Sequence, residues 1–130
     1  MCDLLHYGHL QFLKMCRKYC DYMVVGVYTD ELAASYKRTP VIPFEERIAL
    51  VRELRCVDEV RKVVNKDATP MLKRLVEEGY NVKYLFHGDD WEKVEGEEFI
   101  RSIGGSLIQF PYYPYRSTSN IIEKIRGSTQ

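Results

Sequence analysis

The sequence predicts an α/β fold in which a parallel β-sheet carries helices on both faces and so makes three layers. Apolar runs rich in β-branched residues alternate along the chain with segments whose apolar residues recur every three or four positions. The first pattern is typical of buried parallel strands and the second of amphipathic helices. The length of 130 residues fits one compact domain, so we expect a single domain over residues 1–130.

Composition and charge exclude several classes of protein. The chain has 19 basic and 19 acidic residues, so no net field favours nucleic acid or stable membrane insertion. No apolar run approaches the ~20 residues of a membrane span, and Asp3 and His6 interrupt any candidate signal sequence. The four cysteines form no pair of C-x-x-C motifs, which favours reduced thiols over a zinc site or a disulfide. We therefore expect a cytoplasmic protein.

The expected elements follow from these patterns in order. Leu4 and Leu5 are expected to end a buried strand that turns directly into an amphipathic helix over 9–20. A nearly continuous apolar run predicts a strand buried on both faces over 22–28. A short polar segment and a loop with two prolines follow, and Pro43 suits the first turn of the next helix. The later elements are a helix over 44–54, strands over 57–64, 82–86 and 107–110, helices over 69–79 and 97–103, and a last helix capped by Ser117-Thr118-Ser119.

Three polar segments come at predicted strand-to-helix turns, and we expect them at one edge of the sheet, where such folds bind ligands. The first, His6-Tyr7-Gly8-His9, opens a helix whose N–H groups and dipole suit an anion. Gly8 lets the backbone approach a ligand closely. Two histidines at this spacing can also be surface residues near a turn, and the motif alone is weak. The other two segments are residues 87–91 and 117–119.

Taken together, these motifs resemble those of the H-x-G-H cytidylyltransferases, over essentially the whole chain. The matching segments are residues 3–9, Thr29-Asp30-Glu31, Glu46-Arg47, residues 55–60, residues 88–91 and residues 116–119. The compact glycerol-3-phosphate cytidylyltransferases are most similar, with the ethanolamine-phosphate and choline-phosphate enzymes as relatives. The resemblance implies a Rossmann-like nucleotidyltransferase that transfers CMP from CTP to a phosphorylated alcohol, with glycerol-3-phosphate or ethanolamine phosphate favoured. It also implies Mg²⁺ bound mainly through the CTP phosphates, a homodimer, and a product that serves as a phospholipid or teichoic acid precursor.

Two departures from the family pattern change the expectations. The family has a strand before the Asp-Leu-Leu segment, whereas this sequence has only Met1-Cys2 there, so we expect the first strand to be truncated. The family also has an arginine separated by four residues from its final Ser-Thr pair. Tyr112 holds that position here, and Arg116 directly precedes Ser117. We expect Arg116 to supply the charge instead.

The resemblance assigns roles to named residues. His6 and His9 would donate hydrogen bonds to the triphosphate, as transfer of this kind depends on positioning and charge stabilisation. Lys37 would reach the phosphates of both substrates, with Arg38 as the alternative. The remaining assignments are catalysis for Arg116, nucleotide binding for Asp3, Gly8, Asp89, Asp90, Ser117, Thr118 and Ser119, and substrate binding for Lys37, Trp91 and Tyr112.

Several of these residues have a second interpretation. Asp89 and Asp90 can accept from the cytosine amino group or form a polar turn. Ser117 and Thr118 can bind the β- and γ-phosphates or cap a helix, and both can hold at once. Trp91 can be a wall of the site or a hydrophobic plug. The sequence also leaves open an adenylyltransferase of the same superfamily and a catalytically silent nucleotide-binding protein.

Overall fold

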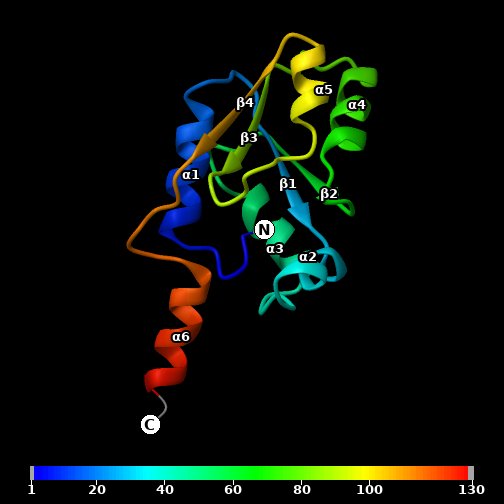
Figure 1. Ribbon diagram of the computed structural model, residues 1–130. Coiled ribbons are helices and arrows are strands. Elements are labelled where there is room, and N and C mark those ends of the chain that lie inside the picture. The colour runs from blue at the N-terminus through cyan, green and yellow to red at the C-terminus, as the bar shows by residue number, and fades with distance from the viewer. Residues whose placement is uncertain (1, 129–130) are drawn as a thin grey trace. The chain divides into compact units, whose positions relative to one another are not determined.

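The computed structural model describes residues 2–128 (Figure 1). These residues group into two compact units, one formed by residues 2–62 with 113–128 and the other by residues 63–112. Helices and strands alternate within the described residues, and the strands form two two-stranded sheets. The α/β class is therefore confirmed, whereas the single domain over residues 1–130 stays a prediction.

The elements are named in chain order and labelled in Figure 1. They are α1 (Tyr7–Arg17), β1 (Val24–Tyr28), α2 (Asp30–Tyr36), α3 (Phe44–Arg52), β2 (Glu59–Val63), α4 (Thr69–Glu77), β3 (Tyr84–Gly88), α5 (Glu97–Ser102), β4 (Ser106–Phe110) and α6 (Thr118–Ser128). No helix in the described part of the chain is long and apolar enough to cross a membrane.

In the first unit, β1 pairs with β2 and α3 packs on β1. Val27 of β1 and Val51 of α3 are fully buried. Arg47 of α3 is fully buried as well, and its guanidinium donates to the carbonyl oxygen of Ile42 at 2.8 Å and to Oδ1 of Asp30 at 2.7 Å. A buried charge is tolerated where it is paired and hydrogen-bonded, so Arg47 ties α3 to the start of α2.

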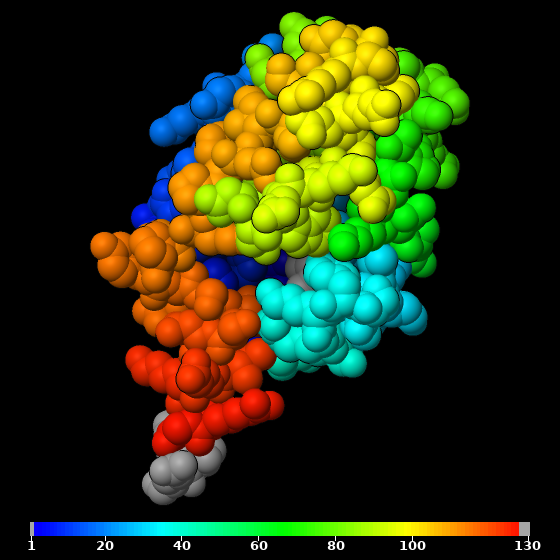
Figure 2. All heavy atoms as spheres, in the orientation of Figure 1, coloured from blue at the N-terminus to red at the C-terminus, as the bar shows by residue number. Residues whose placement is uncertain are grey.

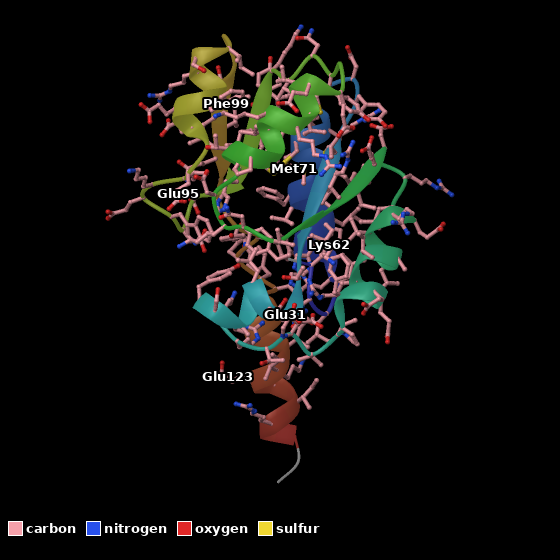
Figure 3. All side chains as sticks on the ribbon, turned by 90° about the vertical axis from the view of Figure 1, so that its right-hand side faces the viewer. Glu31, Lys62, Met71, Glu95, Phe99 and Glu123 are labelled. Carbon is pink, nitrogen blue, oxygen red and sulfur yellow. The ribbon has the colours of Figure 1, made fainter. Side chains whose placement is uncertain are left out.

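The second unit is built on the parallel pair of β3 and β4. Their register runs from Tyr84 opposite Ser106 to Gly88 opposite Phe110. Helix α5 packs on both strands and α4 packs on α5; Figure 3 marks Met71 on α4 and Phe99 on α5. Ile100 of α5 is fully buried. Residues 89–91 directly follow the carboxyl end of β3 and begin the loop after it.

Several sequence-based expectations differ from the structure; strand β3, for example, covers Tyr84–Gly88 where 82–86 was expected. Residues 3–4 form a turn, with Leu4 at a positive φ of 48°, so Leu4 and Leu5 do not end a strand. Helix α1 covers residues 7–17 where 9–20 was expected. Strand β1 is mostly half-exposed because, among the described strands, only β2 flanks it. Helix α2 was not predicted, although Thr29 caps it and acidic residues fill its first turn.

Asp3 connects three segments of the first unit. Its side chain is 1% exposed, and its two carboxylate oxygens accept from the backbone N–H groups of Val41 and Ile42, each at 2.9 Å. Its carbonyl oxygen accepts from the hydroxyl of Thr118 at 2.7 Å. The stretch before α1, the loop between α2 and α3, and the start of α6 are therefore held at one residue.

We predict that Asp3→Ala destabilises the protein by about 2 kcal/mol, because two partly buried backbone N–H groups lose a charged acceptor. Urea unfolding of the two proteins measures the difference. Asp21→Ala, at an exposed carboxylate, is the matched control and should stay close to wild type. Equal loss in both variants would show that Asp3 is not the connection described here.

Candidate active site

The H-x-G-H segment closes the N-terminus of α1 through its two histidines. His6 is the residue that caps the helix, and its Nδ1 accepts from the backbone N–H of Gly8 at 3.0 Å. The Nδ1 of His9 reaches back and accepts from the backbone N–H of His6 at 3.1 Å. This reciprocal arrangement is the capping box that Ser or Thr with Glu or Gln commonly forms. Here imidazoles fill both roles, and the helix starts two residues earlier than the sequence predicted.

These two hydrogen bonds fix the tautomer of both rings. Because each Nδ1 accepts from an N–H, the proton of the neutral imidazole lies on Nε2. The rings are stacked with their centroids 3.9 Å apart and their planes at 28°. Each histidine thus keeps one N–H donor, at Nε2, for a ligand.

Both histidines are held in the neutral form. Burial, followed by the charge of His6, lowers the pKa of His9 to about 3, and Lys37 adds to this effect. Burial and the guanidinium of Arg116 lower the pKa of His6. Near neutral pH the pair is therefore two neutral donors beside two cationic side chains.

Gly8 brings the backbone before α6 against the H-x-G-H turn. A Cβ at this position would lie 2.8 Å from Cε1 of His6 and 3.0 Å from the carbonyl oxygen of Arg116. The glycine was expected to allow close approach of a ligand. In the structure it allows close approach of the His6 ring and of the Arg116 backbone. The side chain of Arg116 is exposed, and its Nη1 lies 3.4 Å from Oδ1 of Asn120.

The three hydroxyl residues at the start of α6 have different partners. Oγ of Ser117 accepts from the N–H of Asn120 at 3.0 Å, so the predicted cap is confirmed at this residue. The hydroxyl of Thr118 is buried and donates to Asp3. Oγ of Ser119 accepts from Nη1 of Arg38 at 3.5 Å. The cap and the Asp3 bond together fix the start of the helix.

Lys37 and Arg38 lie in the loop that Asp3 holds. Lys37 follows the last turn of α2 and is exposed, and its charge acts on His9. Arg38 is partly buried, and it is the residue that touches Ser119. The loop therefore directs one cation toward the imidazoles and the other toward α6.

Tyrosines form a chain of edge-to-face contacts beside the histidines. The rings of Tyr7 and Tyr113 are 5.3 Å apart at 81°, and those of Tyr113 and Tyr115 are 5.4 Å apart at 71°. Tyr7 and Tyr115 are more than half exposed. This tyrosine row, Tyr7, Tyr113 and Tyr115, gives the site an aromatic surface that packs on itself and still faces solvent.

The remaining predicted residues lie in the second unit, at the carboxyl end of β3. The hydroxyl of Tyr112 donates to Oδ1 of Asp90 at 3.0 Å, and its ring covers Gly88, where an added Cβ would lie 2.3 Å from it. Trp91 contacts the ring of His87 at 4.2 Å and lies under the ammonium of Lys66 at 4.6 Å. Asp89 and Asp90 are exposed. Tyr112 therefore positions Asp90, and Trp91 is packed between two side chains.

Gln109 of β4 is a residue that sequence reasoning missed. Its Nε2 donates to the carbonyl oxygen of Gly88 at 3.1 Å and to that of Trp91 at 3.0 Å. These bonds hold the loop after β3 in place. An amide side chain within an apolar strand is the signal that could have pointed to it.

We predict that His9 makes the free energy of unfolding depend on pH below 6.5. The pKa of His9 is depressed in the folded protein, so its contribution to stability is complete above pH 6.5 and is lost as the pH falls toward about 3. His9→Gln keeps an acceptor for the cap N–H and removes the titration. Urea unfolding between pH 7 and 4 should show a flatter dependence in His9→Gln, and parallel curves would contradict the prediction.

Comparison with known proteins places this arrangement in a family. Residues 2–124 match the model of a family described as cytidylyltransferase-like. The chain is 38% identical over 128 residues to the bifunctional protein HldE of Geotalea uraniireducens (strain Rf4), a match that covers 95% of this chain and 25% of that protein. It is 39% identical over 89 residues to the ethanolamine-phosphate cytidylyltransferase of Arabidopsis thaliana, covering 68% of this chain and 21% of that protein.

The fold has a counterpart among solved structures. The crystal structure of a lipopolysaccharide core biosynthesis protein from Thermoplasma volcanium GSS1 matches with a TM-score of 0.65 and 26% identity, covering 85% of this chain and 90% of that one. This match agrees with the Rossmann-like nucleotidyltransferase fold expected from the sequence. The chain spans about a quarter or less of the length of the two curated relatives named above. Because the family model matches nearly the whole sequence, the chain belongs to the cytidylyltransferase-like family.

Proposed function

We propose that the protein transfers CMP from CTP to a phosphorylated alcohol, with ethanolamine phosphate or glycerol-3-phosphate favoured. A phosphate oxygen of the alcohol attacks the α-phosphorus, the bond to the bridging oxygen breaks, and pyrophosphate leaves with the electron pair. The observation that carries this proposal is the pair of neutral imidazoles, each with a free Nε2 donor, at the start of α1. The similarity to ethanolamine-phosphate cytidylyltransferases supports the choice of substrates.

In this proposal, the residues of the first unit act on phosphate. His6 and His9 donate from Nε2 to the α-phosphate, where negative charge grows as the fifth bond forms. Lys37 and Arg116 are the cations whose charges act on these rings, so they are placed to attract the same phosphate. Ser117 caps α6 and Ser119 lies in its first turn, whose positive dipole end favours the outer phosphates.

We propose a structural role for Asp3 and a metal ion that is bound by the substrate. Both carboxylate oxygens of Asp3 accept from backbone N–H groups, so we assign Asp3 to holding the loop of Lys37 and give it no nucleotide contact. No group of three His, Cys, Asp or Glu residues in the described chain could hold a metal ion. We expect Mg²⁺ to arrive with CTP as part of the substrate. We also expect the enzyme to be a homodimer, as the compact family members suggest.

The second unit carries the residues proposed to read the base and the alcohol. Asp90 offers a carboxylate oxygen that can accept from the cytosine amino group, and Tyr112 positions it. Trp91 and Tyr112 supply aromatic surface for the substrate. An adenylyltransferase remains the second candidate, because the matches that cover 95% of the chain are to proteins whose name does not specify cytidine.

We predict pyrophosphate release with CTP and Mg²⁺ in the presence of ethanolamine phosphate or glycerol-3-phosphate. His9→Ala should lower the rate by about 10²- to 10³-fold, the loss typical of one oxyanion donor. A coupled pyrophosphate assay with CTP and with ATP measures both. Faster turnover with ATP would replace the cytidine assignment with the second candidate. A folded protein that binds CTP and releases no pyrophosphate would be catalytically silent.

We predict that kcat falls in steps from wild type to Arg116→Lys to Arg116→Ala. Arg116→Lys keeps the charge and loses the planar fork, so it should retain CTP binding and lose much of kcat. Arg116→Ala should lose about 10³-fold, the low end for an arginine that stabilises a phosphoryl transition state. Steady-state kinetics and CTP titration separate the two effects. A wild-type rate in Arg116→Ala would show that the charge comes from another residue.

A further inference from the structure

Arg38 carries hydrogen-bond donors without a partner. Its Nε and Nη2 atoms are buried, and neither has a hydrogen-bond acceptor among residues 2–128. Its Nη1 makes the 3.5 Å contact with Oγ of Ser119. Buried donors on a charged group are costly to leave unpaired, so a water, an ion or a ligand is expected to complete them.

The two unpaired atoms are adjacent on the guanidinium. The N–H of Nε and one N–H of Nη2 point in the same direction and form a fork that matches two oxygens of one phosphate or carboxylate. The third nitrogen, Nη1, is the one that faces Ser119. The unpaired side of Arg38 is therefore the side best suited to bind an anion through two parallel hydrogen bonds.

The surroundings of Arg38 indicate which anion fits. Figure 2 shows the cyan surface of α2 and its following loop beside the orange-red segment that leads into α6. The charge of Arg116 lowers the pKa of His6, and that of Lys37 lowers the pKa of His9. Arg38 instead contacts the start of α6 through Ser119. A phosphate at the Arg38 fork is thus next to the one held by the imidazoles and belongs to the outer part of the same chain of phosphates.

We propose that Arg38 binds the terminal phosphate of the nucleoside triphosphate through Nε and Nη2, with Ser119 holding the guanidinium in place. This inference rests on the proposed nucleotidyl transfer and adds a residue that recognises the leaving group. When the bond to the α-phosphorus breaks, negative charge moves onto pyrophosphate, and Arg38 stabilises that charge. Arg38 thereby distinguishes nucleoside triphosphates from monophosphates and retains pyrophosphate after transfer.

The test measures binding of pyrophosphate and of CMP to the full chain by titration calorimetry. Arg38→Gln should weaken pyrophosphate binding by about 10- to 100-fold, the range expected for a charge-assisted bidentate contact, and should leave CMP binding unchanged. The pyrophosphate affinity of Arg38→Lys should fall between those of the wild type and Arg38→Gln, because lysine keeps the positive charge and lacks the planar fork. Arg74→Gln is the matched control, because Arg74 is an exposed arginine of α4 paired with Glu78.

Thermal unfolding separates binding from a structural role. With its fork unpaired in the free protein, Arg38 adds no stability and its buried donors cost some, so Arg38→Gln should keep or raise the wild-type Tm. An unchanged affinity for pyrophosphate in Arg38→Gln, or a lowered Tm of the ligand-free variant, would overturn the proposal. Neither measurement depends on turnover or on the base, so the preference for CTP can fail while the assignment of Arg38 stands.

Discussion

The buried carboxylate of Asp3 is the constraint on which the first unit depends. A carboxylate that leaves water loses its hydration, and two backbone N–H groups of one loop replace it here. Because these donors are consecutive amides, they fix the backbone of the loop and not merely one side chain. Its own carbonyl oxygen binds Thr118, which sets the start of α6. One residue therefore holds in place the segments that carry Lys37, Arg38 and the hydroxyl residues.

Hydrogen bonds at Nδ1, burial and nearby charges together make the two imidazoles of the H-x-G-H segment neutral donors. Each Nδ1 accepts from a backbone N–H at the start of the helix, His6 Nδ1 from Gly8 of α1 and His9 Nδ1 from the cap residue His6, and such groups otherwise lack a partner there. The bond that caps the helix thus also places the proton of each neutral ring on Nε2. Nearby cations and burial oppose protonation, so the donors need no proton rearrangement when a phosphate arrives. The same pair of side chains caps the helix and, in the proposed function, binds the phosphate.

The sequence predicted the α/β class, most elements and the residues that meet at the first-unit site, because periodicity, caps and motif spacing are local properties. Its errors have physical causes. Leu4 and Leu5 are apolar enough for a strand, yet Asp3 binds the loop and turns the chain there. Helix α2 is short and polar, so its apolar period is weak, although Thr29 signalled its start. Tertiary contacts such as those of Arg38 with Ser119, 81 residues apart, leave no local pattern.

The predicted residues divide between the two units by the part of the nucleotide that they are proposed to bind. Those of the first unit are suited to the phosphates, and those of the second unit to the base and the alcohol. The histidines, Lys37, Arg38 and Arg116 are suited to phosphate, which CTP and ATP share, so their geometry cannot select the nucleotide. Selection must come from contacts with the base and the alcohol, and the candidates for these lie around Asp90 and Tyr112. Tyr112 stands where the resembling family has its arginine, and its hydroxyl donates to Oδ1 of Asp90. In the proposed function, Tyr112 therefore holds Asp90 in place for an amino group of the base, while Arg116 supplies the cation that acts on the phosphates.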